Sequence, residues 1–319
     1  MVDASLASLN TESIETERLS VHARLLIGCI RAIGALPFSL RSTLGGAIGY
    51  IVGLFPFREA LIARLHLSLF ISEKHAKRLV PHVFANLGRS ILESFNLQPR
   101  IRSPFPYVSC PNWDRIEGFT KEDRPVIALT AHTGNWDLLA AYAIARGMPI
   151  STVGKEARNP HLQATLRSVR DAYGIETIWR SDRSGVKRIV NCFKNKRVMA
   201  ALIDQDTRVD SSFIPFFGVP AKTPSALIDL GKRFNASFVS AFMVRTKGSR
   251  FEILAEEIPD GLSSDEILAE YHSRLEKVIR AHPTQWVWFH KRWRSKDDGT
   301  TLSTREYLAW LESQCAAHT

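Results

Sequence analysis

Beyond residue 112 the chain alternates between short apolar runs and longer segments with apolar positions at helical spacing. The apolar runs are bounded by Pro, Gly or charged residues and predict buried strands at 125–130, 149–153, 175–179, 197–203, 236–244 and 250–256. Helices are expected at 138–146, 160–173, 184–194, 223–234 and 264–281. In the fourth of these, Thr223 is the expected N-cap and Pro224 the first helical residue. The alternation predicts an α/β fold, with a mostly parallel sheet flanked by helices.

The segment before this region is expected to be helical. Apolar residues recur at helical spacing in LIARLHLSLF (61–70) and VFANLGRSILESF (83–95), and the proline-containing stretch 103–111 ends the pattern. We therefore expect a disordered acidic tail at 1–17, a helical region at 18–100 and an α/β domain at 101–319. In the alternative division, residues 18–319 form one compact unit.

Two apolar stretches in the helical region allow two interpretations. Residues 42–57 carry no charge, and 25–40 are apolar apart from Arg31 and are interrupted by Pro37. Neither stretch has the roughly 18–20 uninterrupted apolar residues of a spanning helix. They are either buried core helices or a monotopic or re-entrant membrane anchor. In the second case the flanking arginines meet lipid phosphates, namely Arg18, Arg24, Arg31, Arg41, Arg58 and Arg64.

The composition points to a folded protein with an anionic partner. Hydrophobic residues make up 45% of the chain and charged residues 23%, which excludes global disorder. The net charge is +10, and because residues 1–17 hold four acidic residues and no Lys or Arg, the rest carries +14. Such a charge favours nucleic acid, an anionic membrane or an acidic protein. The four cysteines are far apart in the sequence and no secretory signal precedes them, so we expect a reducing compartment.

The stretch AHTGNWDLL (131–139) places His132 at the end of a predicted strand and Asp137 near the first turn of a predicted helix. A neutral histidine can take a proton from a hydroxyl group, and a carboxylate on its other nitrogen makes it a better base. Gly134 permits the tight turn that would bring Asp137 back to His132. Spacing alone leaves open a simpler interpretation, in which Asp137 caps the helix and His132 is incidental.

No protein nucleophile is apparent beside this pair. The chain lacks GxSxG, GxxxxGK[ST] and HExxH, so a His–Asp pair would serve direct transfer to a hydroxyl of the substrate. Asp204, Gln205 and Asp206 follow another predicted strand and can face the same crevice as His132. Two carboxylates without further ligands are poor evidence for a metal, so a structural or substrate-orienting role is preferred and no metal is expected.

Four blocks in order resemble the bacterial lipid A late acyltransferases, the lauroyl and myristoyl transferases within the HxxxxD/E acyltransferases. They are AHTGNWDLL, NPHLQATLRSVRDAYGI (159–175), IDQDTRVDSSFIPFFGVPAKTPSAL (203–227) and HPTQWVWFHKRWRS (282–295). The resemblance covers roughly residues 20–296. It implies a glycerolipid-acyltransferase-like α/β fold and transfer of a fatty acyl chain to a hydroxyl of a lipid A precursor, at the cytoplasmic face of the bacterial inner membrane.

The resemblance also implies roles for individual residues. His132 is the general base, Asp137 its orienting carboxylate, and Arg170 contacts the thioester oxyanion or a substrate phosphate. The further residues expected to bind substrate are Asn135, Asp204, Asp206, Phe216 in a wall of the acyl tunnel, and Arg292. The donor is acyl carrier protein or acyl-CoA, the acceptor is a lipid, and no cofactor is expected.

Three alternatives stay open at this point. The acceptor can be a lysophospholipid or another lipid. A noncatalytic membrane-binding protein can keep the same fold. The basic and aromatic residues of 282–295 could also bind RNA, but no nucleic-acid-binding motif supports this, so no nucleic-acid partner is expected.

Overall fold

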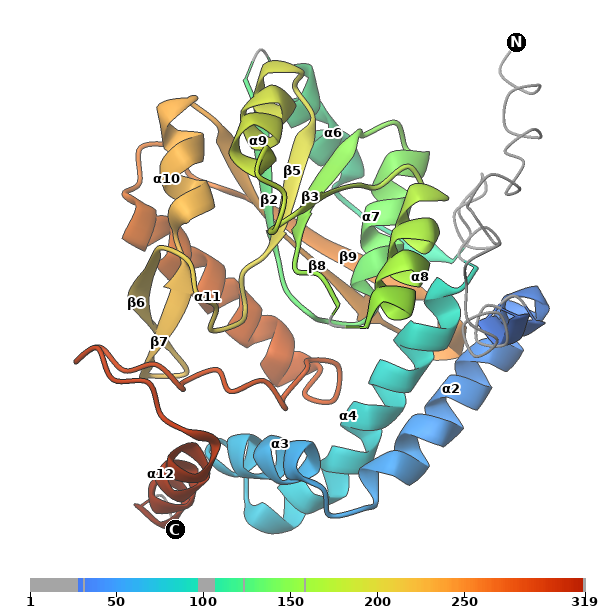
Figure 1. Ribbon diagram of the computed structural model, residues 1–319, viewed down its shortest axis with the longest axis vertical. Coiled ribbons are helices and arrows are strands. Elements are labelled where there is room, and N and C mark those ends of the chain that lie inside the picture. The colour runs from blue at the N-terminus through green and yellow to red at the C-terminus, as the bar shows by residue number, and fades with distance from the viewer. Residues whose placement is uncertain (1–27, 31, 97–106, 123, 158, 318–319) are drawn as a thin grey trace.

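The structure is a computed structural model of the 319-residue chain and describes residues 28–30, 32–96, 107–122, 124–157 and 159–317. The predicted tail at 1–17 lies outside the described residues, as do Arg18, Arg24 and Arg31. The described part consists of an α/β sandwich with a group of helices below it in Figure 1, and the chain ends beside those helices.

A seven-stranded sheet forms the centre of the sandwich. Its strand order is β1-β9-β8-β2-β5-β3-β4. Strands β8, β2, β5, β3 and β4 are mutually parallel, β9 runs antiparallel to β8, and β1 is parallel to β9. The strands are β1 (Val108–Ser109), β2 (Val126–Thr130), β3 (Ile150–Gly154), β4 (Glu176–Trp179), β5 (Val198–Leu202), β8 (Ser237–Arg245) and β9 (Phe251–Ile258). The six strands expected from the apolar runs are thus confirmed, with end shifts of one or two residues.

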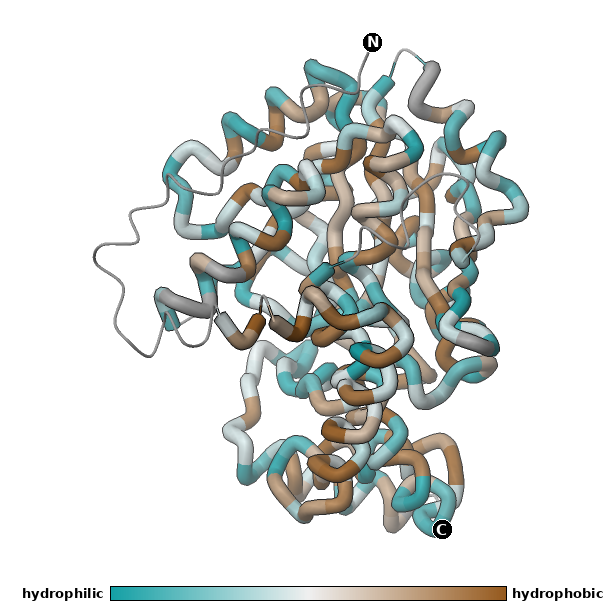
Figure 2. The backbone as a smooth tube through the Cα atoms, turned by 90° about the vertical axis from the view of Figure 1, so that its right-hand side faces the viewer, coloured by the Kyte–Doolittle hydropathy of each residue, from teal (hydrophilic) through white to brown (hydrophobic). Residues whose placement is uncertain are grey.

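Helices cover both faces of this sheet (Figure 1). One face packs against α6 (Trp113–Lys121), α7 (Trp136–Ala145) and α8 (Pro160–Asp171), and the other against α9 (Gly185–Lys194), α10 (Ala226–Arg233) and α11 (Ser264–Ala281). Each face has its own buried apolar cluster, because side chains alternate between the two sides of a strand. In Figure 2 the inner strands are mostly brown while the helices alternate between brown and teal. The predicted α/β class with a mostly parallel sheet is confirmed.

A two-stranded hairpin was not expected from the sequence. Strands β6 (Ser211–Phe216) and β7 (Val219–Pro224) pair antiparallel beside α11. Thr223 and Pro224 therefore lie in a strand, and the prediction that they begin the helix is wrong: α10 starts at Ala226, with Ser225 before it. The hydroxyl of Thr223 accepts a hydrogen bond from buried Arg292, which holds this residue in the hairpin.

The N-terminal region is helical, as predicted, with α2 (Phe38–Gly53), α3 (Arg58–Ser68) and α4 (Glu73–Ser94). Helices α2 and α4 pack through glycine. A Cβ added to Gly45 would lie 2.3 Å from the carbonyl oxygen of Gly88, and one added to Gly49 would lie 2.1 Å from that of Phe84.

The C-terminal helix α12 (Thr304–Ala317) is tied to α3, because buried His66 hydrogen-bonds the Tyr307 hydroxyl at 2.6 Å.

Within the described ranges no single helix is both long and apolar enough to cross a membrane. Helices α2 and α3 reach that threshold only when taken together, and they are bent by 86° at the break between them. Arg41 does not have the lipid-facing position that the membrane-anchor interpretation assigned to it. Its side chain is fully buried and donates to the carbonyl oxygens of Leu36, Leu92, Glu93 and Asn96, so it closes the C-terminal end of α4.

Candidate active site

The loop between β2 and α7 presents His132 at the carboxyl edge of the sheet. Gly134 adopts a positive φ of 52°, and a Cβ at this position would lie 2.4 Å from the carbonyl oxygen of Met243, so only glycine fits. The amide of Gly134 donates to the carbonyl oxygen of Gln285 at 3.0 Å. Asn135 then caps α7, since its side-chain oxygen accepts a hydrogen bond from the amide of Leu138.

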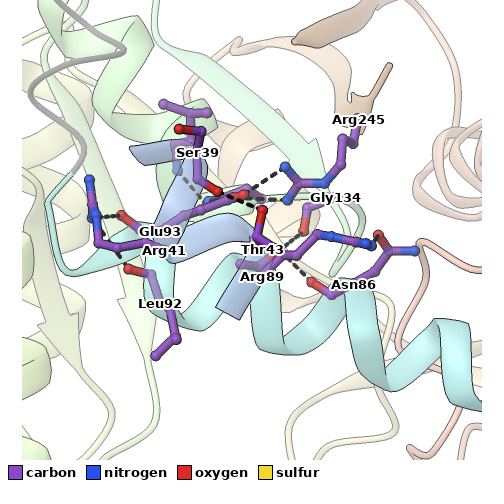
Figure 3. A network of polar contacts seen from close by, with 12 residues as sticks. Ser39, Arg41, Thr43, Asn86, Arg89, Leu92, Glu93, Gly134 and Arg245 are labelled. Carbon is purple, nitrogen blue, oxygen red and sulfur yellow. Dashed lines mark hydrogen bonds and ion pairs between the residues drawn. The ribbon is translucent and has the colours of Figure 1, made fainter. Parts of the chain in front are cut away.

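Helix α4 holds this loop from the other side. The hydroxyl of Ser90 donates to the carbonyl oxygen of Gly134 at 2.6 Å, and the Asn135 amide donates to the fully buried carboxylate of Glu93 at 3.0 Å. Arg245 donates twice to Glu93, at 2.7 and 2.8 Å, as Figure 3 shows together with Gly134. The charge of Glu93 is thus paired and hydrogen-bonded, which a buried carboxylate requires. The helical region and the sheet together fix the position of His132.

Asp204 is the carboxylate that contacts His132. It follows β5, the neighbour of β2, and its Oδ1 lies 2.8 Å from the Nδ1 of His132. The other oxygen of Asp204 accepts from the backbone amide of His132 and from the indole nitrogen of Trp286, both at 2.9 Å. The prediction that these two strand ends face the same crevice is confirmed.

The charge state of Asp204 decides the tautomer of His132. Burial by itself raises the pKa of Asp204, but the charge of His132 and the hydrogen bonds from its ring and its backbone amide outweigh this, and the pKa lies well below the usual range. Asp204 is therefore ionised and can only accept hydrogen bonds. The Nδ1 of His132 then carries the hydrogen, and its Nε2 has a free lone pair.

Asp137 has a different partner from the one expected. Its Oδ1 lies 3.5 Å from the Nε of Arg170 in α8, and no ion pair joins it to His132 in the part of the chain that the structure describes. Asp137 is the second residue of α7, and its carboxylate lies against a residue of α8 and not against the histidine that it was expected to orient. The guanidinium of Arg170 also lies 6.0 Å from the ring centre of Trp179.

Two further polar residues lie near His132: Gln205, which was expected to face this crevice but was given no role of its own, and His290, which was not predicted. The amide nitrogen of Gln205 lies 3.2 Å from the Nε2 of His132 and 2.6 Å from the Nε2 of His290. Burial and the nearby charge of His132 lower the pKa of His290 to about 4, so His290 is neutral at physiological pH and can accept from the amide. Both residues lie in the sequence blocks that carry the family resemblance, and this was the available signal.

Besides Asp204, which contacts His132 from below the cavity surface, four predicted substrate-binding residues do not line the cavity at His132. Asn135, at 1% exposure, forms the cap described above, and Asp206 accepts from the amide and hydroxyl of Ser295 at 2.8 and 3.1 Å. Phe216 is fully buried and packs on His272 and Trp293. The contacts of these residues stabilise the protein around the site.

Arg292 is the fourth of these residues. It is fully buried, contacts the hairpin at Lys222 and Thr223, and lies 3.0 Å from the ring of His272. Arg292 thus links the hairpin to the C-terminal segment.

A cavity of about 790 Å³ opens at His132. His132, Asp137, Arg170 and Gln205 line it at the carboxyl edge of the sheet, and most of its remaining lining is aliphatic. Cavities of this size bind small ligands, and an apolar lining suits a hydrocarbon chain. The arrangement therefore places a hydrogen-bonded histidine at the entrance to a space for an apolar ligand.

Comparisons with known proteins agree with this arrangement. A lipid A biosynthesis acyltransferase 2 of Shigella flexneri is 26% identical over 278 residues, 83% of this chain and 87% of that protein. A lipid A biosynthesis palmitoleoyltransferase of Escherichia coli (strain K12) is 24% identical over 281 residues, 83% and 88% of the two chains. A phosphatidylinositol mannoside acyltransferase of Mycobacterium tuberculosis (strain CDC 1551 / Oshkosh) is 24% identical over 173 residues, 53% and 54% of the two chains.

Fold, site and relatives define the protein as an acyltransferase. Residues 12–295 match the family of bacterial lipid A biosynthesis acyltransferases, and because this match spans most of the chain, the protein belongs to that family. The resemblance drawn from the four sequence blocks is confirmed.

Proposed function

We propose that the protein transfers a fatty acyl chain from a thioester donor to a hydroxyl group of a lipid A precursor, with His132 as the general base. The observation that carries this proposal is the 2.8 Å contact between His132 and Asp204 at the entrance of the apolar cavity. Family membership supplies the class of reaction.

The reaction needs one base and no covalent enzyme intermediate. The Nε2 of His132 takes the proton of the acceptor hydroxyl while that oxygen attacks the thioester carbonyl carbon. Asp204 stabilises the imidazolium that forms, since its carboxylate lies on Nδ1. The C–S bond then breaks, and the leaving thiolate takes the proton back from Nε2. The products are the acyl ester and the free thiol, and His132 is neutral again.

Gln205 is the proposed hydrogen-bond donor at the reacting centre. Its amide lies 3.2 Å from the Nε2 of His132, where the acceptor hydroxyl must bind to give up its proton. The amide, held by neutral His290, can then donate to the thioester carbonyl oxygen as negative charge develops there. Arg170 is held in place by Asp137. It is the second candidate for stabilising this negative charge, or it binds a substrate phosphate.

The donor is expected to be anionic. Four basic side chains line the cavity together with three acidic ones, and the chain beyond its first 17 residues carries +14. Acyl carrier protein is strongly acidic and acyl-CoA carries phosphates, so this net positive charge attracts both, with a Debye length of about 10 Å at 0.1 M salt. We expect acyl carrier protein to be the faster donor, with a KM that rises with salt. Equal use of acyl-CoA without a salt effect would contradict this.

Helix α2 is the proposed membrane attachment, at the cytoplasmic face of the inner membrane. The large side chains on its outer surface and at its end are exposed, with Ile48, Ile51, Leu54 and Phe55 between 56% and 62% accessible. Its glycines face α4 instead, so the apolar residues point away from the protein. An exposed apolar helix face of this kind suits insertion between lipid head groups and chains. Complete release from membranes by high salt alone would contradict this attachment.

A different lipid acceptor is the second candidate. The observation that favours it is the similarity to a relative named phosphatidylinositol mannoside acyltransferase, although that match covers only about half of each chain. The site chemistry is the same for any lipid hydroxyl.

Lipid mass spectrometry of a deletion strain separates the two acceptors. Loss of one acyl chain from lipid A, restored by the wild-type gene and not by the His132→Ala gene, is the expected result. An unchanged lipid A profile together with an altered phospholipid or glycolipid would favour the second candidate. No change in any lipid would support a noncatalytic protein.

A further inference from the structure

The cavity at His132 extends along both faces of the sheet. Its lining includes Ala200 and Ala201, which are consecutive residues of β5. Consecutive side chains of a strand point to opposite faces, and accordingly Ala200 packs with the apolar cluster under α7, whereas Ala201 belongs to the cluster under α9 and α10. One cavity therefore has two apolar compartments, which meet at the carboxyl edge where His132 and Gln205 lie.

The first compartment, called here the α7 compartment, is lined mainly by apolar residues. It lies between the sheet and the helices α6 and α7. Its lining includes Trp113, Ala128, Ala140, Met148, Ala200 and Ala241. Ala128 and Ala200 are direct neighbours in the sheet, so small side chains on adjacent strands leave the space open. Such a space suits a hydrocarbon chain alone.

The second compartment, called here the α9 compartment, is apolar at its base and polar at its rim. It lies between the sheet and the helices α9 and α10. Its lining includes Ile189, Ala201, Ile203, Leu227, Leu230 and Arg233. Asp210 and Asp229 also line it, and Val186 at its edge is 70% exposed. Such a space suits an apolar chain that is attached to a polar head group outside.

A single donor chain cannot fill both compartments. The thioester carbonyl must lie at His132, and one chain extends from it in one direction along one face of the sheet. We propose that the α7 compartment takes the donor's acyl chain and that the α9 compartment binds an acyl chain already present on the acceptor lipid. This inference rests on the proposed function, because only then are both substrates lipids. The two chains would lie on opposite faces of the sheet, with the reacting groups between them at His132.

Neighbouring alanines give a matched test. Ala200→Leu fills part of the α7 compartment and Ala201→Leu fills part of the α9 compartment, with the same added volume one residue apart. The donors are acyl carrier proteins charged with chains of defined length, and the acceptors are a lipid A precursor and the same precursor after mild alkaline removal of ester-linked chains.

Ala200→Leu is expected to shift the preferred donor to shorter chains and to leave the acceptor KM unchanged. Ala201→Leu is expected to raise the acceptor KM by about tenfold or more, because the added side chain excludes about two methylene groups of the acceptor and their binding free energy is lost. The preferred donor length should not change. With the deacylated acceptor, wild type and Ala201→Leu should have the same KM, because the chain that the substitution excludes is missing.

Overpacking can destabilise a buried strand, so a second pair uses half-buried helix positions. Leu139→Phe on α7 and Ile189→Phe on α9 narrow the same two compartments. A shift of donor length in Ala201→Leu and Ile189→Phe, or an acceptor KM within twofold of wild type in both, would overturn the proposal. Absence of transfer by the wild-type protein would instead overturn the proposed function, so the two failures are distinguishable.

Discussion

The Nδ1 of His132 and the Oδ1 of Asp204 lie 2.8 Å apart although 71 residues separate them in the sequence, because each follows one of two adjacent parallel strands, β2 and β5. The pair comes from the topology of the sheet and not from a local turn. This distinguishes Asp204 from Asp137, which is close to His132 in sequence and contacts Arg170 instead.

Asp204→Asn should lower kcat by about 10²–10⁴-fold, because an amide can hold the imidazole in the wrong tautomer. The loss should persist at every pH, since Asp204 is ionised throughout the working range. Steady-state kinetics of the purified variant and a thermal melt are the measurements. A folded Asp204→Asn protein with activity within threefold of wild type would rule out the orienting role.

Asp137 is expected to act through Arg170. Asp137→Asn and Arg170→Gln should each reduce kcat/KM, and the double variant should be little worse than the more severe single one, because both remove the same interaction. Additive losses for Asp137 and Arg170 would show that the two residues act separately.

Three buried histidines should make the protein acid-sensitive. Burial lowers the pKa of His66 and His290 to about 4 and that of His272 to about 3, whereas the unfolded chain has values of about 6.5. The unfolded state binds these protons first, so stability is complete above about pH 6.5 and falls as pH drops toward 4. Each such histidine contributes up to about 1.4 kcal/mol per pH unit to the slope.

The measurement is the free energy of denaturant unfolding between pH 7.5 and 5. His66→Gln should reduce the slope of this free energy against pH by the contribution of one histidine. This holds whether or not the substitution also changes the stability at neutral pH. His75→Gln, at an exposed residue on α4, provides the control for a histidine substitution outside the core. A pH-independent free energy over this range would mean that the buried histidines do not stay neutral in the folded protein.

Gly49→Ala should separate α2 from α4, since the added methyl group would lie 2.1 Å from the carbonyl oxygen of Phe84. Overpacking of this kind costs about 1–3 kcal/mol. The matched control is Gly118→Ala in α6, where an added Cβ meets nothing within 4 Å. Thermal unfolding should show a lower Tm for the first variant and an equal or higher one for the second. Equal Tm values for Gly49→Ala and wild type would contradict the close packing of these helices.

The apolar pattern predicted the sheet well because buried strands between Pro, Gly and charged residues leave a strong signal. It also placed His132 and Asp204 at one edge of the sheet, since the carboxyl ends of parallel strands meet there. The β6–β7 hairpin gave no such signal: Pro215, Gly218, Pro220 and Pro224 interrupt it, and Pro is unusual in strands.

The site was predicted less completely than the fold. Proximity in sequence favoured Asp137 as the partner of His132, whereas in the structure Asp137 lies against Arg170 and Asp204 takes the position beside His132. Phe216 and Arg292 were assigned to substrate because aromatic and basic residues often bind lipids, but both are fully buried. Burial depends on packing between segments far apart in the chain, which a sequence pattern does not contain.

The role of His132 is the central claim, and the transfer rate of purified His132→Ala tests it most directly. The assay measures acyl transfer from acyl carrier protein to a lipid A precursor in detergent, with a thermal melt to establish that the variant is folded. Loss of the general base should lower kcat by about 10²–10⁴-fold. A folded His132→Ala protein whose kcat is within twofold of wild type would contradict the account.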